Sequence, residues 1–385
     1  MTLPRSVWAS LFALVAATIG MGLVVPILRP LSVAFDASPA QTLLLVSVYM
    51  VCLGAAMPFT SAVSSRLGVR RTLVGALLLN VVCGVVSSLA GDIGVVICAR
   101  AGWGLGNALF LATVLAVVIE EAGALSGRAI RYFEAAVGIG ISAGPLAGGV
   151  LGAISWRAAF LGSATMMLVA AVSLMILLPR AERGPLATGV FAPFRALLQP
   201  GLLVLGLASL LYNVGFLMMF TFTPFPLARG PEFVGLVYCG WGLALVFSST
   251  FVGPRVQRRI GTLASFTVGT TGFAVVLVVM AVFADRDAVL VAGVISSGLA
   301  LGVSNTMMTE AAMASSSTDH TTTSAAYNLM RNAGPAAAPW LAGTLGESLN
   351  VHAPFLFGAI SAIVAVVLVL ALMGREVVAP VVSRV

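Results

Sequence analysis

The sequence predicts an all-α membrane protein whose twelve transmembrane helices form two pseudo-symmetric six-helix bundles. Three observations support this fold class: an apolar composition, a series of long apolar segments and a partial internal repeat. Of the 385 residues, 60% are hydrophobic and 9% are charged, whereas soluble domains carry about 25% charged residues. Too few charged side chains remain to cover a water-facing surface, so the composition argues against a large soluble protein.

Twelve segments are long and apolar enough to cross a bilayer, which takes about 20 residues. They lie at 7–31, 41–63, 72–90, 94–118, 132–153, 157–178, 201–223, 232–253, 262–284, 288–312, 322–346 and 354–374. If the N-terminus is inside, 14 arginines fall in the inner connections and 4 in the outer ones. The positive-inside rule therefore predicts that both termini are cytoplasmic.

The chain divides into an N-terminal bundle at 1–178 and a C-terminal bundle at 201–385. The connection between them, 179–200, is rich in Pro, Gly and Arg, and we expect it to be a cytoplasmic linker. Short matches recur at corresponding places in the two halves. "RLGVRRTL" follows the second span and "RIGTLASF" follows the eighth, while "AGP" occurs in the fifth and the eleventh. These matches favour a parallel duplication.

Other function classes find little support in the sequence. The net charge of +7 comes from arginines scattered between apolar runs, which indicates membrane orientation and no nucleic-acid partner. The four cysteines lie in apolar runs without metal-ligand spacing, so no metal site is predicted. There is no Gly-Lys-Ser/Thr loop for ATP and no catalytic cluster of histidines or aspartates.

The loop after the second span resembles the gating motif of the major facilitator superfamily. In "SAVSSRLGVRR" the residues Arg66, Gly68, Arg70 and Arg71 match that motif, but Ser65 stands where the family has an aspartate. A serine can only hydrogen-bond, so a cytoplasmic lock would need another carboxylate. Glu120 and Glu121, at the end of the fourth span, are the candidates.

The fifth span carries the most specific resemblance. It matches the family's antiporter motif in full, at Gly140, Gly144, Pro145, Gly148 and Gly149. At helical spacing, Gly140, Gly144 and Gly148 form one stripe suited to close helix packing, while Pro145 and Gly149 lie on another face, which would bend or line the pathway. The chain is therefore similar to the twelve-span, proton-coupled multidrug efflux branch, which implies the major facilitator fold.

Ionisable residues inside the spans are candidates for proton coupling. Glu134 shares the face of Pro145 and Gly149, where burial would favour its protonated form; the alternative is a structural pair with Arg131. Glu310, near the end of the tenth span, either binds substrate or protons or meets loop arginines as a helix-end charge.

Two arginines also lie within spans. Arg331, in the eleventh, needs a carboxylate, carbonyls or water around it and would control when a neighbouring glutamate releases its proton. Arg100 matches the family's span-four motif in "RAGWGLG". The resemblance implies a proton relay there, and the alternative is that Arg100 snorkels outward toward Asp92.

Neutral polar residues at span depth are candidates for a substrate cavity or for interhelical hydrogen bonds. They are Asn107, Tyr212, Asn213, Asn305, Tyr327 and Asn328. Many Phe and Met residues surround them in the sequence, so we expect the cavity to suit bulky, lipophilic, neutral or cationic compounds. His320 lies in the polar run "SSSTDHTTT" and is interpreted as a solvated residue.

The first hypothesis is a proton-coupled antiporter that exports lipophilic drugs by alternating access in a bacterial inner membrane. It would need no cofactor, since the proton gradient supplies the energy, and a monomer among membrane lipids suffices. The second is a dedicated exporter of one metabolite, antibiotic or lipid-like compound. The third is a polytopic membrane enzyme, for which no catalytic constellation is found.

Overall fold

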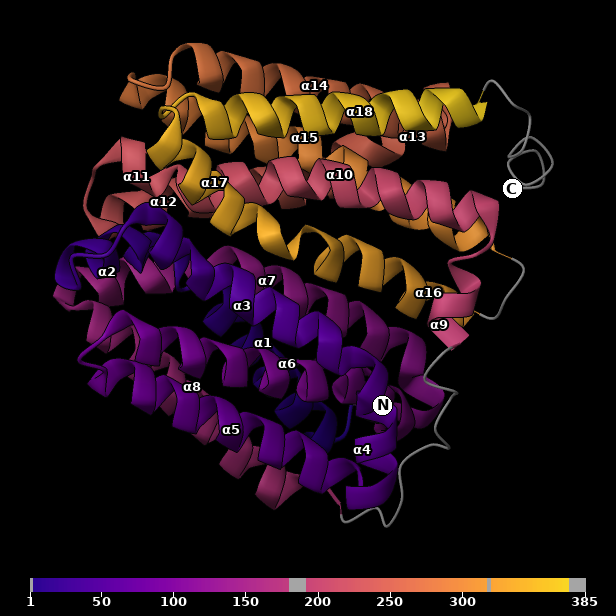
Figure 1. Ribbon diagram of the computed structural model, residues 1–385. Coiled ribbons are helices and arrows are strands. Elements are labelled where there is room, and N and C mark those ends of the chain that lie inside the picture. Colours follow the sequence, from indigo (N-terminus) through magenta and orange to yellow (C-terminus); the bar gives the residue numbers. More distant parts are fainter. Residues whose placement is uncertain (1–2, 180–191, 317–319, 374–385) are drawn as a thin grey trace. The chain divides into compact units, whose positions relative to one another are not determined.

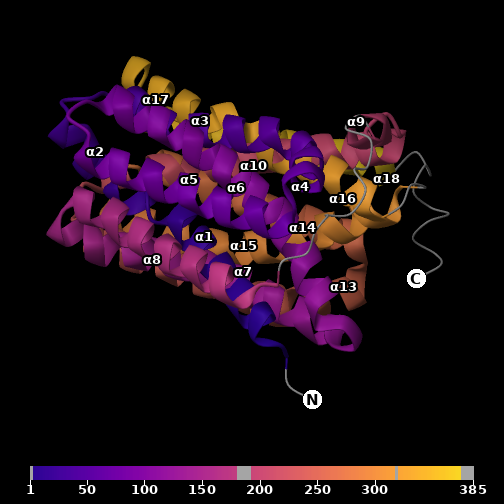
Figure 2. The same cartoon turned by 90° about the horizontal axis from the view of Figure 1, so that it is seen from below.

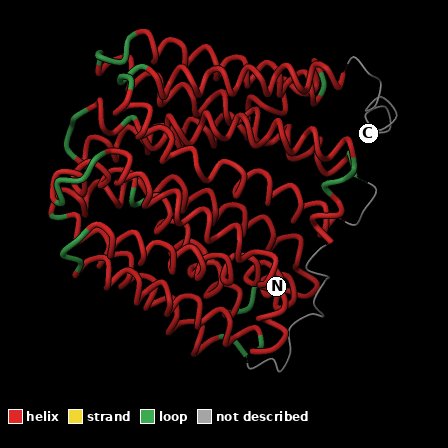
Figure 3. The backbone as a smooth tube through the Cα atoms, in the orientation of Figure 1, coloured by secondary structure: helices red, strands yellow, loops and turns green. Residues whose placement is uncertain are grey.

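The computed structural model describes residues 3–179, 192–316 and 320–373. Within this part the chain is helical, with short loops and no strand (Figure 3). Contacts between Cα atoms divide it into two units. Of the described residues, unit 1 comprises 3–37, 44–179 and 229–239, and unit 2 comprises 38–43, 192–228, 240–316 and 320–373. Each unit therefore includes a short segment from the opposite half of the sequence.

The helices of the first half are α1 (Arg5–Gly22), η1 (Val25–Ile27), α2 (Leu28–Ala34), α3 (Pro39–Ala56), η2 (Met57–Phe59), α4 (Thr60–Leu67), α5 (Val69–Leu89), α6 (Ile93–Ala122), η3 (Gly123–Leu125), α7 (Ser126–Ile154) and α8 (Trp156–Leu177). In unit 1, α1 packs against α6, α7 and α8, while α5 packs against α6 and α8. Helices α1, α7 and α8 lie side by side in both ribbon views (Figures 1 and 2). The interior of this unit is thus formed around α1 and α6.

The helices of the second half are α9 (Ala192–Ala196), α10 (Pro200–Phe222), α11 (Pro224–Leu227), α12 (Pro231–Phe247), η4 (Ser248–Val252), α13 (Gly253–Ile260), α14 (Thr262–Val282), α15 (Asp287–Ala314), α16 (His320–Asn328), η5 (Leu329–Ala333), η6 (Gly334–Ala337), α17 (Ala338–Ser348) and α18 (Ala353–Met373). In unit 2, α10 packs against α15, α17 and α18, and α14 packs against α15 and α18. Helix α10 therefore lies at the centre of this unit.

The same sharp corner occurs in both halves. Gly68 joins α4 to α5 with φ of 83°, and Gly261 joins α13 to α14 with φ of 82°. A residue with a β-carbon rarely adopts this backbone geometry, so glycine allows the chain to turn directly from one helix into the next. The two corners are the places where the "RLGVRR" and "RIGTLA" matches fall.

Eleven helices of the described residues are long and apolar enough to cross a membrane. The twelfth segment, expected as one helix at 322–346, is instead divided among α16, η5, η6 and α17. Pro335 and Pro339 interrupt this stretch, since proline lacks an N–H donor and its ring clashes with the carbonyl four residues earlier. The fold is the all-helical membrane fold that the sequence predicts, and the segment 322–346 is built from pieces too short to count as one apolar span.

Candidate functional site

A polar cluster on α3, α5 and α6 occupies the interior of unit 1. The Nδ2 group of Asn80 donates to Oδ1 of Asn107 at 2.7 Å. Nδ2 of Asn107 in turn donates to the hydroxyl of Tyr49 at 2.8 Å. All three side chains are buried, and these two bonds connect them across helices, while Oδ1 of Asn80 has no hydrogen-bond partner in the described residues. These bonds link three membrane-spanning helices through side chains alone.

Arg100 extends this cluster. Its guanidinium lies over the ring of Tyr49, 4.4 Å from the centroid, and over Trp103 at 5.2 Å. Its Nε donates to the carbonyl of Leu45 at 3.4 Å. The residue is 1% exposed, and Nη1 has no hydrogen-bond partner in the described residues. Unit 1 thus holds a buried cation against two aromatic faces.

The structure favours this interior position over the alternative of snorkelling. Asp92, the proposed outer partner of Arg100, accepts instead from the backbone N–H of Gly94 at 2.6 Å and caps α6. No ion pair joins Arg100 to a carboxylate within the described residues. The positive charge is therefore held by the π-electrons of Tyr49 and Trp103 and by one carbonyl.

A second polar cluster lies in unit 2, on α10, α15 and α16. The hydroxyl of Tyr212 donates to Oδ1 of Asn305 at 2.5 Å, and Ser209 donates to the hydroxyl of Tyr327 at 3.2 Å. Nδ2 of Asn213 donates to the carbonyl of Ser209 at 2.9 Å, within its own helix. The cluster brings together four of the six polar residues proposed for the cavity.

Arg331 lies at the edge of this second cluster. It is in η5 and close enough to Tyr212 for an electrostatic interaction. One turn earlier, Asn328 accepts a 3.5 Å hydrogen bond from Asn332. Asn107, the sixth proposed residue, belongs to unit 1. The proposed cavity residues are therefore divided between two separate polar clusters.

Of the two carboxylates that are expected to couple protons, the structure describes the side chain of only one. The side chain of Glu134 lies outside the described part of the structure, as do those of Arg131 and His320. Glu310 is exposed and accepts from Nε2 of Gln257 at 2.5 Å. No ion pair joins Glu310 to an arginine within the described residues, and the partner of its carboxylate is this neutral amide.

The arginines of the α4–α5 corner do not pair with the two glutamates proposed to replace the missing aspartate. Arg70 donates to the carbonyl of Met175 on α8, and Arg66 is exposed at the end of α4. Glu121 accepts from Ser6 at 2.6 Å. No ion pair joins either arginine to Glu120 or Glu121 in the described residues. The remaining motif residue, Arg71, is exposed in the first turn of α5, and Ser65 donates to the carbonyl of Ala62 at 3.1 Å.

The glycine stripe of α7 packs directly on α1 and the turn after it. A β-carbon added at Gly144 would lie 2.9 Å from the carbonyl oxygen of Ile19, and one at Gly148 would overlap the carbonyl of Leu23. A β-carbon at Gly140 would meet the hydroxyl of Thr18. These contacts explain why small residues are needed, since backbone atoms cannot move aside as a flexible side chain can.

The other face of α7 is equally crowded near its end. A β-carbon at Gly149 would lie 2.7 Å from the carbonyl of Pro231 and 2.9 Å from the Cα of Gly235, both within unit 1. Pro145 is buried inside the continuous helix and touches Gly22. Gly149 therefore packs against backbone in this structure and does not line open space.

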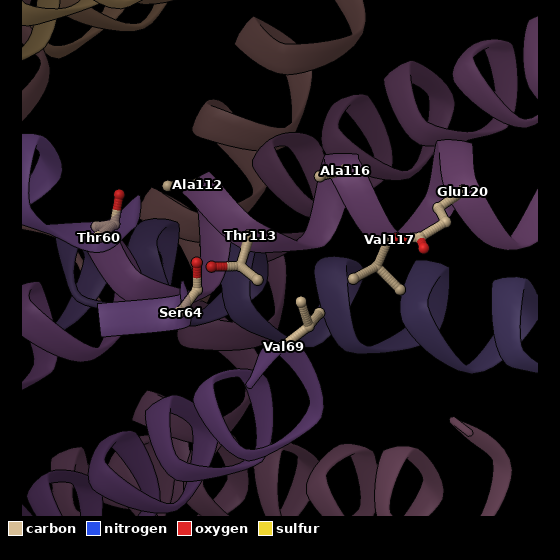
Figure 4. A pocket seen from close by; sticks show the side chains of 8 residues that line it. All are labelled: Thr60, Ser64, Val69, Ala112, Thr113, Ala116, Val117 and Glu120. Carbon is tan, nitrogen blue, oxygen red and sulfur yellow. The ribbon is translucent and has the colours of Figure 1, made fainter. Parts of the chain in front are cut away.

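A cavity of about 90 Å³ lies beside the α4–α5 corner of unit 1 (Figure 4). Three hydroxyl residues and one carboxylate contribute its polar groups: Thr60, Ser64, Thr113 and Glu120. In Figure 4 the hydroxyls of Ser64 and Thr113 point toward one another. The sequence did not single out these hydroxyls, because serine and threonine are common in membrane helices.

Sequence reasoning also missed Tyr49 and Asn80, which connect Asn107 and Arg100 into one cluster. Both are polar residues at span depth, so the criterion applied to Asn107 would have selected them. Their helical spacing gave no further signal, because each lies alone among apolar neighbours.

Comparisons with known proteins agree over nearly the whole chain. The family model described as Major Facilitator Superfamily matches residues 10–232 and 227–384. The chain is 39% identical over 373 residues to the multidrug efflux protein YfmO of Bacillus subtilis, covering 97% of this chain and 94% of that protein. It is 28% identical to a chloramphenicol resistance protein of Streptomyces lividans, covering 87% of each.

A solved structure gives the same fold. A bacterial homologue of the human lysosomal transporter Spinster matches with a TM-score of 0.76 over 98% of each chain, at 14% identity. The motif resemblance, the eleven apolar helices with their segmented twelfth and these matches agree. The protein is a multi-pass membrane transporter and not an enzyme, and it belongs to the Major Facilitator Superfamily.

Proposed function

We propose that this protein is a proton-coupled antiporter that exports lipophilic drugs or similar small molecules. The observation that carries the proposal is the 39% identity, over 97% of the chain, to a protein named for multidrug efflux. The positive-inside distribution of arginines supports a bacterial cytoplasmic membrane with both termini inside. No resident cofactor is required, and one chain suffices for the two units.

Buried Arg100 supports ion coupling in unit 1. An arginine does not release its proton under physiological conditions, so its charge acts as a constant field on the groups around it. Helix α6, which carries Arg100, packs against α7, which carries Glu134. A proton that arrives from outside would neutralise Glu134 and favour one state of the transporter, and its release inside would favour the other.

The polar residues of unit 2 support a permissive substrate site. Tyr212, Asn305 and Tyr327 are neutral, and Asn305 is only half-buried. A few fixed polar groups among apolar walls orient a ligand without demanding one charge pattern. This chemistry accommodates bulky neutral or cationic compounds, which would reach the outside by alternating access of the two bundles.

The experiment is solute flux in proteoliposomes with an imposed pH gradient. A panel of lipophilic dyes and antibiotics is measured with wild-type protein and with Glu134→Gln. Wild-type flux should rise with the gradient, and Glu134→Gln should abolish this response while substrate binding stays measurable.

Two outcomes would contradict the proposal. Flux independent of the gradient in the wild type would remove proton coupling, and unchanged gradient-driven flux in Glu134→Gln would remove that residue from the coupling role. Transport of a single compound from the panel would show a dedicated exporter instead of a polyspecific one.

A further inference from the structure

The α4–α5 corner of unit 1 and the α13–α14 corner of unit 2 share the same backbone turn, but different side chains pack beside them. In unit 2, Nε2 of Gln257 on α13 donates to Glu310 on α15 at 2.5 Å and to the hydroxyl of Thr262 at 3.1 Å. Thr262 is the first residue of α14. One amide group therefore ties three helices together at this corner.

The corresponding residues of unit 1 lack that amide. The corner glycines 68 and 261 set an offset of 193 residues, which places Ser64 opposite Gln257 and Val69 opposite Thr262. Glu120 lies 190 residues before Glu310, at the same end of α6 as Glu310 has on α15. Each unit thus has a carboxylate near the C-terminal end of the corresponding helix, displaced by three residues relative to the offset of the corners, but only unit 2 has the amide.

The missing amide coincides with the cavity in Figure 4. Ser64, Val69 and Glu120 all line this space of about 90 Å³. Because a water molecule takes about 30 Å³ of liquid volume, the space suits roughly three waters or an ion with about as many heavy atoms. The exposed position of Glu120 opens one end of the cavity to solvent.

The cavity accepts hydrogen bonds and carries negative charge. The hydroxyl of Thr60 donates to the carbonyl of Met57 at 2.8 Å, and that of Thr113 donates to the carbonyl of Leu109 at 2.7 Å. Their protons are thereby committed, and their oxygens remain as acceptors. Glu120 adds a carboxylate that no described residue pairs with. A guest that bonds to Thr60, Thr113 or Glu120 must therefore bring the hydrogen-bond donors.

The cavity walls between these oxygens are apolar, and this favours an organic cation over a metal ion. Val69, Ala112, Ala116 and Val117 line the middle of the cavity. Thr113 and Glu120 are about 10 Å apart along α6 at 1.5 Å per residue, so their oxygens do not converge on one point. A Ca²⁺ or Mg²⁺ ion needs six or more oxygens at about 2.0–2.6 Å. An alkylammonium ion instead needs acceptors at its head and apolar contact along its tail.

We propose that the cavity beside Glu120 binds a small primary alkylammonium ion, which takes the place that the amide of Gln257 fills in unit 2. The ammonium head bonds to the Glu120 carboxylate, and the alkyl tail lies against Val69, Ala116 and Val117. The bound ion joins the α4–α5 corner to α6, as Gln257 joins the α13–α14 corner to α15. This site is independent of the transport function proposed above.

The test measures binding to the purified full-length protein in detergent, with ethylammonium as the probe. Equilibrium dialysis should show about one saturable site, and ligand at tenfold its Kd should raise the melting temperature by about 2 °C. Tetramethylammonium at equal ionic strength is the matched control, because it has the charge but no N–H donor. It should leave the melting temperature unchanged.

Three variants test the geometry of the proposed site. Ser64→Gln supplies the amide that unit 2 already has, so it should bond to Glu120 and abolish ethylammonium binding while the protein stays folded. Gln257→Ser removes the amide of unit 2 and should create a second site, which raises the stoichiometry to about two. Glu120→Gln keeps the side-chain shape but removes the charge, and it should also abolish binding.

Equal binding in wild type and Ser64→Gln would overturn the proposal, as would an equal shift with tetramethylammonium. Unchanged binding in Glu120→Gln would do the same, even if Ser64→Gln failed to fold. None of these measurements uses transport, so a failure here is distinct from a failure of the efflux function.

Discussion

The two units carry the same Ala-Gly-Pro sequence, yet it lies in an unbroken helix in one and at a helix break in the other. In unit 1, residues 143–145 are inside α7, which continues as one α-helix past Pro145. In unit 2, residues 333–335 lie at the junction of η5 and η6, where the backbone changes from π to 3-10 geometry. One proline is tolerated in a membrane helix when neighbouring groups satisfy the freed carbonyl.

The two segments also differ in their prolines, since unit 2 has a second one close to this tripeptide. Pro339 comes four residues after Pro335 and lies in the first turn of α17, where its missing N–H costs nothing. Pro335 lacks an N–H donor and its ring crowds the carbonyl four residues earlier, and the backbone there leaves α-helical geometry. The same tripeptide thus lies inside one α-helix in unit 1 and at an interruption in unit 2.

The glycines of the two tripeptides also meet different neighbours. A β-carbon at Gly144 would approach the backbone of α1, at 2.9 Å from the carbonyl of Ile19. A β-carbon at Gly334 would approach the side chain of Leu210, with Cγ at 2.7 Å. Helix α7 therefore packs backbone to backbone, whereas the interrupted segment packs against a side chain that can change rotamer.

The polar interiors differ in how the arginine is placed. Unit 1 holds the buried guanidinium of Arg100 on Tyr49 and Trp103, while unit 2 joins Tyr212 to Asn305 by a neutral bond with Arg331 nearby. We infer that duplication kept the helix arrangement and let each unit acquire its own interior chemistry. The following predictions test this asymmetry.

The largest effect is expected at the backbone contact of α7. Gly148→Leu would drive a side chain into the carbonyl of Leu23, so α1 and α7 must separate. We expect loss of transport and a destabilisation of at least about 3 kcal/mol. Gly138→Leu is the matched control in the same helix, since a β-carbon there meets nothing within 4 Å. Equal melting temperatures for the two variants would refute backbone-to-backbone packing.

A smaller effect should separate the corresponding glycines of the two units. Gly144→Ala must displace the backbone of α1, whereas Gly334→Ala need only move the end of Leu210. We expect Gly144→Ala to lower the melting temperature more than Gly334→Ala, by an amount that thermal unfolding in detergent resolves. If Gly334→Ala were the more damaging of the two, the difference in packing would be wrong.

The smallest effects should come from the hydrogen bonds of the two interiors. Asn107→Leu breaks the bonds to Asn80 and Tyr49, and Tyr212→Phe breaks only the bond to Asn305. Side-chain bonds between membrane helices contribute about 0.6 kcal/mol each, so the expected losses are about 1.2 and about 0.6 kcal/mol. Denaturant titration of both variants measures this ratio, and a larger loss for Tyr212→Phe would show that unit 2 depends more on its polar cluster.

Much of the fold was predictable from composition and spacing. Membrane helices need about 20 apolar residues and closed backbone hydrogen bonds, so hydropathy alone located eleven of the helices. Hydropathy could not predict the interruption at 322–346, because alanine, glycine and proline there are apolar or neutral on average. That break depends on how two prolines and their neighbours satisfy individual carbonyls.

The sequence could predict which residues belong to the candidate site, but it could not predict which of them contact one another. Polar residues at span depth are rare because burying them in a membrane costs free energy. This cost alone was enough to select Arg100, Asn107, Tyr212 and Asn305 as candidates. Which of them meet depends on helix rotation and crossing, and a single sequence does not specify these. The sequence could not predict the cavity beside Glu120 for the same reason. In unit 1 the short side chain of Ser64 occupies the position that the longer side chain of Gln257 has in unit 2.

The chain's chemistry thus determines that it lies in a membrane, how many segments it has and which residues are costly there, because these follow from local hydropathy and charge. Three-dimensional packing determines that Arg100 rests on Tyr49 and Trp103, that α7 meets α1 through glycine and that two equivalent corners are filled differently. These outcomes depend on contacts between segments far apart in the sequence, whose geometry is set by how side chains of particular sizes fit together.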